Sequence, residues 1–150
     1  MASYEVSDSD VTEVKEIIAG SELRSIDFYE VSARRYDAAT ADETCSDEGT
    51  MNVEVQYRSD DDGCFGVRLR GTLNLPRGQA EAIVAGEYDM PADLHPRGRA
   101  LQLFVNEVAV MTLYPYLREG IASITSKVFE KPFHLPLIER GELGLEVDDN

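Results

Sequence analysis

The clearest cluster of chemically capable side chains is Asp60-Asp61-Asp62-Gly63, which is rich in carboxylates. A calcium-binding loop needs oxygen ligands at alternating positions and a distal glutamate at its end, which this compact cluster lacks. Asp-Gly instead supplies the positive φ values that a tight hairpin turn requires. We therefore predict a turn over 59–63 and no metal site.

Histidine, glycine and serine patterns also lack the spacing of a catalytic or cofactor site. His95 and His134 are the only histidines, and both lie near prolines with no cysteine–histidine pattern around them. Gly63 and Gly66 fall within the predicted hairpin, whereas a phosphate loop lies at a strand-to-helix turn. No serine lies in a Gly-x-Ser-x-Gly sequence. The sequence predicts a protein that is not an enzyme and uses no cofactor.

Composition narrows the class further. A length of 150 residues favours one domain over 1–150, with 1–8 and 141–150 loosely ordered. Cys45 and Cys64 are too few for a disulfide framework, so we expect reduced thiols. The first residues are polar and acidic, unlike a signal peptide, and no run of about 18 apolar residues could span a bilayer. We expect a soluble, cytoplasmic protein.

The acidic charge is concentrated in the first part of the chain. Residues 1–62 carry 17 acidic and 5 basic side chains, net −12, and residues 63–150 contribute the remaining −3 of the total −15. This balance disfavours nucleic acids and anionic lipids as partners. Two interpretations stay open: a solvated face with a mobile acidic loop, or an acidic face that binds a basic partner.

The chain then divides into a short helix, strands and further helices. Apolar spacing predicts a helix over 10–19, beginning at Ser9 or Asp10 and ending at Gly20. Alternating and apolar runs predict strands over 23–36, 52–57, 65–75 and 79–90, with an acidic loop at 38–50. Because the four strands follow one another through short turns, we expect an antiparallel meander.

The principal helix is expected over 113–129. Apolar residues recur there at helical intervals, at Leu113, Leu117, Ile121, Ile124 and Val128. Pro115 is well tolerated only in a first turn, which places the start near 112–114 with Thr112 as a candidate N-cap. Lys127 suits the negative end of the helix, and Pro132 prevents its continuation.

A shorter helix should precede the principal one. It is predicted by the apolar spacing of Leu101, Phe104, Val105 and Val108, bends near 109–112, and follows a proline-bounded crossover at 91–98. The sequence therefore predicts an α+β fold, with a four-stranded antiparallel meander and a long helix and short flanking helices packed on one side.

Two segments carry a family resemblance. Leu113-Tyr114-Pro115-Tyr116-Leu117-Arg118-Glu119 and Pro132-x-x-Leu135-Pro136-Leu137-Ile138, placed after a meander and a crossover, resemble the SecB family of protein-export chaperones. The resemblance extends loosely over 23–138. It implies the predicted α+β fold, an ATP-independent holdase activity and a homotetramer built as a dimer of dimers.

Two departures bear on the partners that the family implies. The sequence after Ile138 is a poor helix, although export chaperones have a C-terminal helix and a tail that helps contact the motor ATPase SecA. The helix at 10–19 and the Leu-Tyr-Pro-Tyr sequence are more similar to SecB-like chaperones that protect antitoxins in toxin–antitoxin systems. SecA and an antitoxin therefore both remain open as partners beside unfolded polypeptide clients.

An apolar groove can cover an unfolded client without demanding one sequence, because burial of apolar surface is not directional. We expect client contacts from residues of the crossover, the helices and the segment beyond them: Leu94, Leu101, Phe104, Val105, Val108, Leu113, Tyr116, Leu117, Phe129, Phe133 and Leu135. Any aliphatic among them could instead be core or subunit interface. The aromatic residues Tyr116, Phe104 and Phe133 are the better candidates, since an aromatic residue can stay partly exposed.

A second predicted site is acidic. Asp27, Glu30, Glu54 and Glu87 could present carboxylates from the sheet to a basic partner such as SecA, the alternative being a solvated sheet face. The function predicted overall is a holdase that keeps non-native polypeptides competent for export or folding. A dedicated antitoxin chaperone is the main alternative, and a small ligand-binding or enzymatic domain is a further one.

Overall fold

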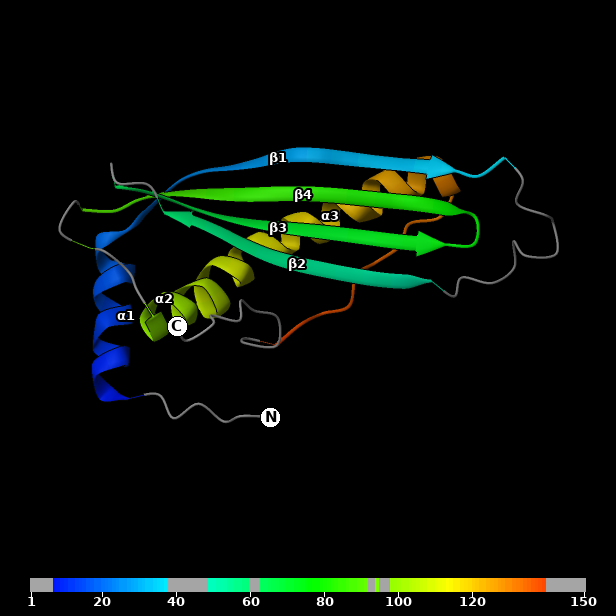
Figure 1. Cartoon of the computed structure of the whole chain (residues 1–150). Coiled ribbons are helices and arrows are strands. Elements are labelled where there is room, and N and C mark those ends of the chain that lie inside the picture. Colours follow the sequence, from blue (N-terminus) through cyan, green and yellow to red (C-terminus); the bar gives the residue numbers. More distant parts are fainter. Residues whose placement is uncertain (1–6, 38–48, 60–62, 92–93, 95–97, 140–150) are drawn as a thin grey trace.

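The computed structural model describes residues 7–37, 49–59, 63–91, 94 and 98–139. Residues 38–48 of the predicted acidic loop at 38–50, the turn residues 60–62, Cys45, His95 and the segment 141–150 lie outside the described residues. The elements follow in the order α1 (Asp8–Gly20), β1 (Glu22–Arg35), β2 (Thr50–Ser59), β3 (Cys64–Leu75), β4 (Gly78–Asp89), α2 (Gly98–Phe104), a π-helical turn (Val105–Ala109) and α3 (Val110–Phe129). Figure 1 shows one sheet with α3 lying across one face and α1 and α2 together at one end.

The four strands form one antiparallel sheet in the order β1-β4-β3-β2. Strands β2, β3 and β4 make the predicted meander, but the placement of the first strand within it is wrong, because β1 pairs with β4. The connection over 36–49 is too long to act as a hairpin turn, so β1 is free to lie at the far edge. The result is a Greek key, with β1 and β2 as the two edges. The predicted α+β class and the one-sided helical layer are confirmed.

Side chains alternate between a face that packs on α3 and a face turned away from it, here called the outer face. Two irregularities in β1 change this alternation, and the second brings two of the predicted acidic residues onto one face. Phe28 pairs with Val84 and Glu30 pairs with Ile83, so Tyr29 is an extra residue between them. Such a bulge shifts the following residues to the opposite face. It therefore returns Glu30 to the outer face, which Asp27 also occupies opposite Ala85.

The helix α1 begins earlier than the sequence predicted. Ser7, and not Ser9 or Asp10, is the N-cap, and Ser7 and Asp10 form a capping box in which each side chain accepts from the other's backbone N–H, both at 3.2 Å. The Ser7 hydroxyl also donates to the Asp10 carboxylate, and these hydrogen bonds lower the pKa of Asp10. Residues 7 and 8 thus belong to the start of α1.

The helix α3 also starts before its predicted position. Residues 98–129 are helical throughout, and the departure from α-geometry lies at the π-helical turn Val105–Ala109, where Val110 N–H donates to Val105 O, instead of at 109–112. Pro115 therefore lies inside α3, where its missing N–H removes one backbone hydrogen bond. Thr112 is not an N-cap, because its hydroxyl donates to Val108 O at 2.8 Å within the helix. The predicted end at Phe129 is confirmed.

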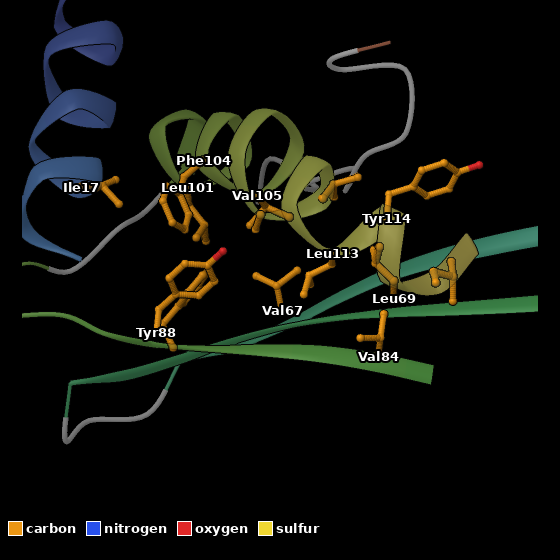
Figure 2. Packing of buried hydrophobic residues seen from close by; sticks show 14 of the residues in the cluster. Ile17, Val67, Leu69, Val84, Tyr88, Leu101, Phe104, Val105, Leu113 and Tyr114 are labelled. Atoms are coloured by element: carbon orange, nitrogen blue, oxygen red, sulfur yellow. The ribbon is translucent and has the colours of Figure 1, made fainter. Parts of the chain in front are cut away.

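The core lies between the sheet and the helical layer. Figure 2 shows Val67, Leu69, Val84 and Tyr88 of the sheet facing residues of α2 and α3. The Phe104 ring meets Phe65 and Tyr88 edge-on, with ring centroids 5.9 and 5.3 Å apart. Burial raises the pKa of Tyr88 above its ordinary value. This packing fixes α2 and the start of α3 on the sheet.

Candidate functional site

The segment Lys131–Ile138, here called the strap, runs back along α3. Three side chains of the helix each bind its backbone: Thr125 Oγ1 accepts from Phe133 N–H at 2.8 Å, Arg118 Nε donates to Leu135 O at 2.8 Å, and Tyr114 OH donates to Pro136 O at 2.5 Å. The helix positions fall from 125 to 114 as the strap positions rise from 133 to 136. The strap is therefore antiparallel to α3 and is held in place without a strand of its own.

The strap has a buried side and an exposed side. Leu135 is 1% exposed and belongs to the main core, whereas Leu137, two residues further on, is 80% exposed. Phe133 is half-buried between the main core and a smaller cluster around Phe129. An apolar side chain as exposed as Leu137, on a backbone this well held, is a ready contact for apolar groups outside the protomer.

Most of the predicted client contacts are core residues in this structure. Seven of the eleven are buried: Leu101, Phe104, Val105, Leu113, Leu117, Phe129 and Leu135. Their spacing identified the apolar side of the helices correctly, but the sheet and the strap cover that side. Phe104 in particular, predicted to stay partly exposed, is 1% exposed. These seven offer a client no surface here, and we assign them to the core.

The remaining four predicted contacts do not form one groove. Leu94, Val108 and Phe133 are half-buried against the core, and Tyr116 is 45% exposed on the solvent side of α3. Leu94 lies against Gly20 at the end of α1, while Phe133 lies beyond the far end of α3. The apolar surface available to a client is therefore distributed along the helical layer.

The sequence reasoning missed an apolar row on β1. Leu23, Phe28 and Val31 point to the helix side of the sheet, opposite Tyr88, Val84 and Ala82, yet they are 38 to 42% exposed. They are exposed because β1 is an edge strand. Alternation in the sequence indicated the strand, but it carried no signal for edge position. An edge strand with an apolar row is a surface on which another strand can pair.

The four predicted acidic residues do share one surface, since Asp27, Glu30, Glu54 and Glu87 all lie on the outer face. That surface also carries arginines. Arg58 Nη2 donates to both carboxylate oxygens of Glu87, at 3.0 and 3.1 Å. The acidic interpretation must therefore include the cations interleaved with these carboxylates.

A second arginine lies among the carboxylates of the outer face. Arg70 pairs with Glu81, and this carboxylate, followed by the more distant Glu54 and Glu30, raises the pKa of Arg70. Arg68 lies over the ring of Tyr29, 4.5 Å from its centroid. The outer face thus combines carboxylates with arginines, two of which form the ion pairs Arg58–Glu87 and Arg70–Glu81, and it is not a bare acidic patch.

Features of an active centre do not emerge from the described residues. No group of three or more His, Cys, Asp or Glu side chains within 7–37, 49–59, 63–91, 94 and 98–139 is placed to hold a metal ion. Cys64 has intermediate exposure, and His134 lies exposed on the strap. Among the helices that the structure describes, none has the length and apolar character to cross a membrane.

SecB-like chaperones are among the known proteins that are similar to this chain. The SecB-like chaperone SmegB of Mycolicibacterium smegmatis is 29% identical over 134 residues, which cover 89% of this chain and 86% of that protein. The Rv1957 SecB-like chaperone of Mycobacterium tuberculosis, solved in complex with a ChAD peptide from the Rv1956 HigA1 antitoxin, superposes with a TM-score of 0.70 and 19% identity, over 86% of this chain and 98% of that one. No family model matches the chain. The match in sequence and the match in structure both extend over nearly the whole fold.

Proposed function

Because the chain is a homologue of the SecB-like chaperones, we propose that it is an ATP-independent holdase that binds non-native polypeptides and keeps them competent for folding or export. The observation that carries this proposal is the similarity to SmegB over 89% of the chain. The apolar surface along the helical layer supports it physically. Tyr116 and Leu137 give an unfolded segment apolar contacts that do not depend on one sequence.

Release from such a surface follows from competition and needs no hydrolysis. Each contact is weak, and affinity comes from several contacts made at once by one extended client. The proposal accordingly includes no catalytic residue, metal or cofactor. It also includes residence in the cytoplasm, where Cys64 would stay reduced.

The proposal includes self-association. The edge strand β1 presents unpaired backbone groups and the apolar row Leu23, Phe28 and Val31. Pairing with β1 of another copy would give these backbone groups hydrogen-bond partners and would bury the apolar row. Two such pairs would form the homotetramer, a dimer of dimers, that the resemblance implies. Apolar contacts on several protomers would then act on one client.

A dedicated antitoxin chaperone is the second candidate. The structure with the same fold was solved with an antitoxin peptide bound, which favours this candidate for the present chain. SecA is a partner only if the protein acts as a general holdase in export. For SecA, the outer face offers fewer available carboxylates than a bare acidic face would, because Glu87 and Glu81 are paired with arginines. A dedicated antitoxin chaperone would bind one peptide selectively instead of many different non-native polypeptides.

Light scattering from a denatured, slow-folding protein diluted into buffer, with no nucleotide added, tests the proposal. We expect suppression of aggregation that saturates near one tetramer per client. No suppression by a folded oligomer would exclude the general holdase. In that event, binding of one antitoxin segment by the same oligomer would support the dedicated role.

A further inference from the structure

The strap lies on α3 in the way that an extended peptide lies in a binding groove. Between Lys131 and Ile138 it forms neither a helix nor a strand, and each of its three hydrogen bonds to α3 described above joins a helix side chain to a backbone N–H or C=O of the strap. Every peptide carries such backbone groups, whatever its sequence. The helix therefore holds the strap through features that any extended chain shares.

The side chain of Leu135 anchors the strap in the main core. It is 1% exposed, whereas Phe133 is half-buried and Leu137 is exposed. Large apolar residues thus occupy alternate positions of an extended segment, and the middle one is fully covered. The groove beneath the strap accepts a large apolar side chain and the backbone on both sides of it, which is the chemistry that a non-native chain presents.

Opening of the strap alone would be unfavourable. It would empty the position of Leu135 and remove the Phe133 N–H from the buried hydroxyl of Thr125. That hydroxyl donates its own proton to Ile121 O at 2.6 Å and accepts from the strap. A vacated apolar position and an unsatisfied polar group both cost free energy. An incoming segment that supplies an apolar side chain and a backbone N–H restores both contacts, so we expect the strap to stay closed until such a segment replaces it.

The chain reverses direction at Glu130, directly after the end of α3. This residue has a φ of 63°, in the left-handed region, and its side chain is exposed. Residues at the end of a helix can absorb the change in φ and ψ that moves a neighbouring segment. Rotation at Glu130 would lift the strap and leave α3 in place on the sheet, because Phe129 before it is buried.

We propose that the groove beneath the strap is a binding site for an extended peptide segment with large apolar side chains at alternate positions, and that the strap occupies this site when no such segment is bound. The strap then acts as an internal competitor, which lowers the apparent affinity for the segment by the fraction of molecules whose groove is open. Leu137, on the exposed side, remains a contact for a client while the strap is closed. This inference rests on the proposed function and adds to it a client site that is closed at rest.

A synthetic peptide with the sequence of the strap, Lys-Pro-Phe-His-Leu-Pro-Leu-Ile, tests the proposal. It carries a fluorescent label at its N-terminus, and its binding to the protein is followed by fluorescence anisotropy. A matched peptide has serine in place of the first leucine, which corresponds to Leu135. We expect the strap peptide to bind and the serine peptide to bind about tenfold more weakly, because it lacks the apolar anchor.

Displacement of the strap is observed at the backbone amide of Phe133. In protein made with isotopically labelled phenylalanine, NMR reports the hydrogen exchange of this amide while unlabelled peptide is added. Its exchange should accelerate about tenfold at saturating peptide, because its N–H leaves Thr125 Oγ1. The amide of Phe129 in α3 should exchange at an unchanged rate. This measurement uses the unmodified protein and does not depend on the folding of a variant.

A weakened strap should compete less well for its own groove. Leu135→Ala removes the anchor from the strap and leaves α3 unchanged, so the strap peptide should bind this variant about tenfold more tightly than the unmodified protein. Ile17→Ala is the matched control, because Ile17 is also a buried aliphatic residue of the core but belongs to α1. It should lose stability without a gain in affinity for the peptide. Circular dichroism at the assay temperature reports whether both variants are folded.

Several results would overturn the inference: no binding of the strap peptide to either the unmodified protein or Leu135→Ala, binding without a change in Phe133 exchange, equal binding of the serine peptide, or an equal gain of affinity in Ile17→Ala. Aggregation assays on the same proteins keep the proposed function separate. Suppression of aggregation together with any of these results would reject the site beneath the strap alone. Absence of suppression by the unmodified protein would reject the holdase.

Discussion

The two faces of the sheet use the same four strands in opposite ways. On the helix side, apolar residues such as Val67 and Val84 pack under α3, and the exposed apolar side chains lie at the margins, on the edge strands β1 and β2, on α1, on α3 and on the strap. On the outer face, carboxylates and arginines pair with one another. Unpaired apolar surface attracts a non-native chain, whereas paired charges already satisfy each other. We therefore propose that clients bind at the margins of the helical layer.

The contrast between buried and exposed apolar side chains is largest within the strap, and substitutions there should give the largest difference in the free energy of unfolding. Leu135→Ala should destabilise the protein by about 2 to 4 kcal/mol, because it empties a buried position. Leu137→Ala, on the exposed side of the same segment, should change stability by less than about 0.5 kcal/mol. Urea unfolding followed by circular dichroism measures both. Equal losses would mean that the strap has no buried side.

The edge strand gives the next largest effect. Val31→Lys places a charge in the apolar row of β1 and should weaken self-association by tenfold or more, by an order-of-magnitude expectation for a buried interfacial charge. Light scattering coupled to size-exclusion chromatography measures the mass. Val11→Lys, on an equally exposed position of α1, is the control. An unchanged mass for Val31→Lys would remove β1 from the interface.

A smaller effect is expected on client binding from the solvent side of α3. Tyr116→Ala removes an aromatic side chain that is 45% exposed, and should weaken suppression of client aggregation about fivefold without loss of the oligomer. The light-scattering assay described above reports it. Leu137→Ala is expected to act in the same direction. Full suppression by both variants together would contradict a client surface along the helical layer.

The outer face should respond weakly. Glu87→Gln breaks the ion pair with Arg58, which is largely exposed, and should cost less than about 1 kcal/mol in the free energy of unfolding. Client binding should not change. A loss of aggregation suppression in this variant, with stability retained, would mean that clients use the outer face as well.

The smallest effect concerns pH and the start of α1. The pKa of Asp10 is lowered in the folded protein, so the carboxylate stabilises the capping box above its unfolded pKa, near 3.8, and this contribution disappears as pH falls through the lower folded value. Backbone NMR shifts of Ser7 and Asp10 between pH 6 and 2 should report the opening. In Ser7→Ala the Asp10 carboxyl still titrates, and the midpoint of its transition should rise toward 3.8. An unchanged midpoint in Ser7→Ala would contradict the assignment.

The sequence predicted the elements well because periodicity reports local geometry. The four strands were predicted from alternating polar and apolar residues, and the end of α3 at Phe129 from the helical spacing of apolar residues and the proline that follows. The start of α3 did not follow, because the rule for Pro115 assumes a helix that begins there, and nothing local indicated a π-helical turn before it. The order of the strands could not be predicted from local sequence either, since β1 pairs with β4, the last strand in the sequence.

The candidate site was harder to predict because burial depends on neighbours distant in the sequence. The spacing of Leu113 and Leu117 marks an apolar stripe, but it does not distinguish a stripe covered by a sheet from one left open to a client. Asp27 and Glu30 are three residues apart and would fall on opposite faces of a regular strand. Only the bulge at Tyr29 brings them together, and the pairing of Glu87 with Arg58 required the register of three strands.

Site-specific photo-crosslinking tests the central claim most directly. A photoreactive phenylalanine analogue is placed at position 137 on the strap in one protein and at position 68 on the outer face in another, and each is irradiated with a denatured, labelled client. The account predicts strong crosslinks from position 137 and background levels from position 68. Strong crosslinks from position 68, with none from position 137, would contradict it.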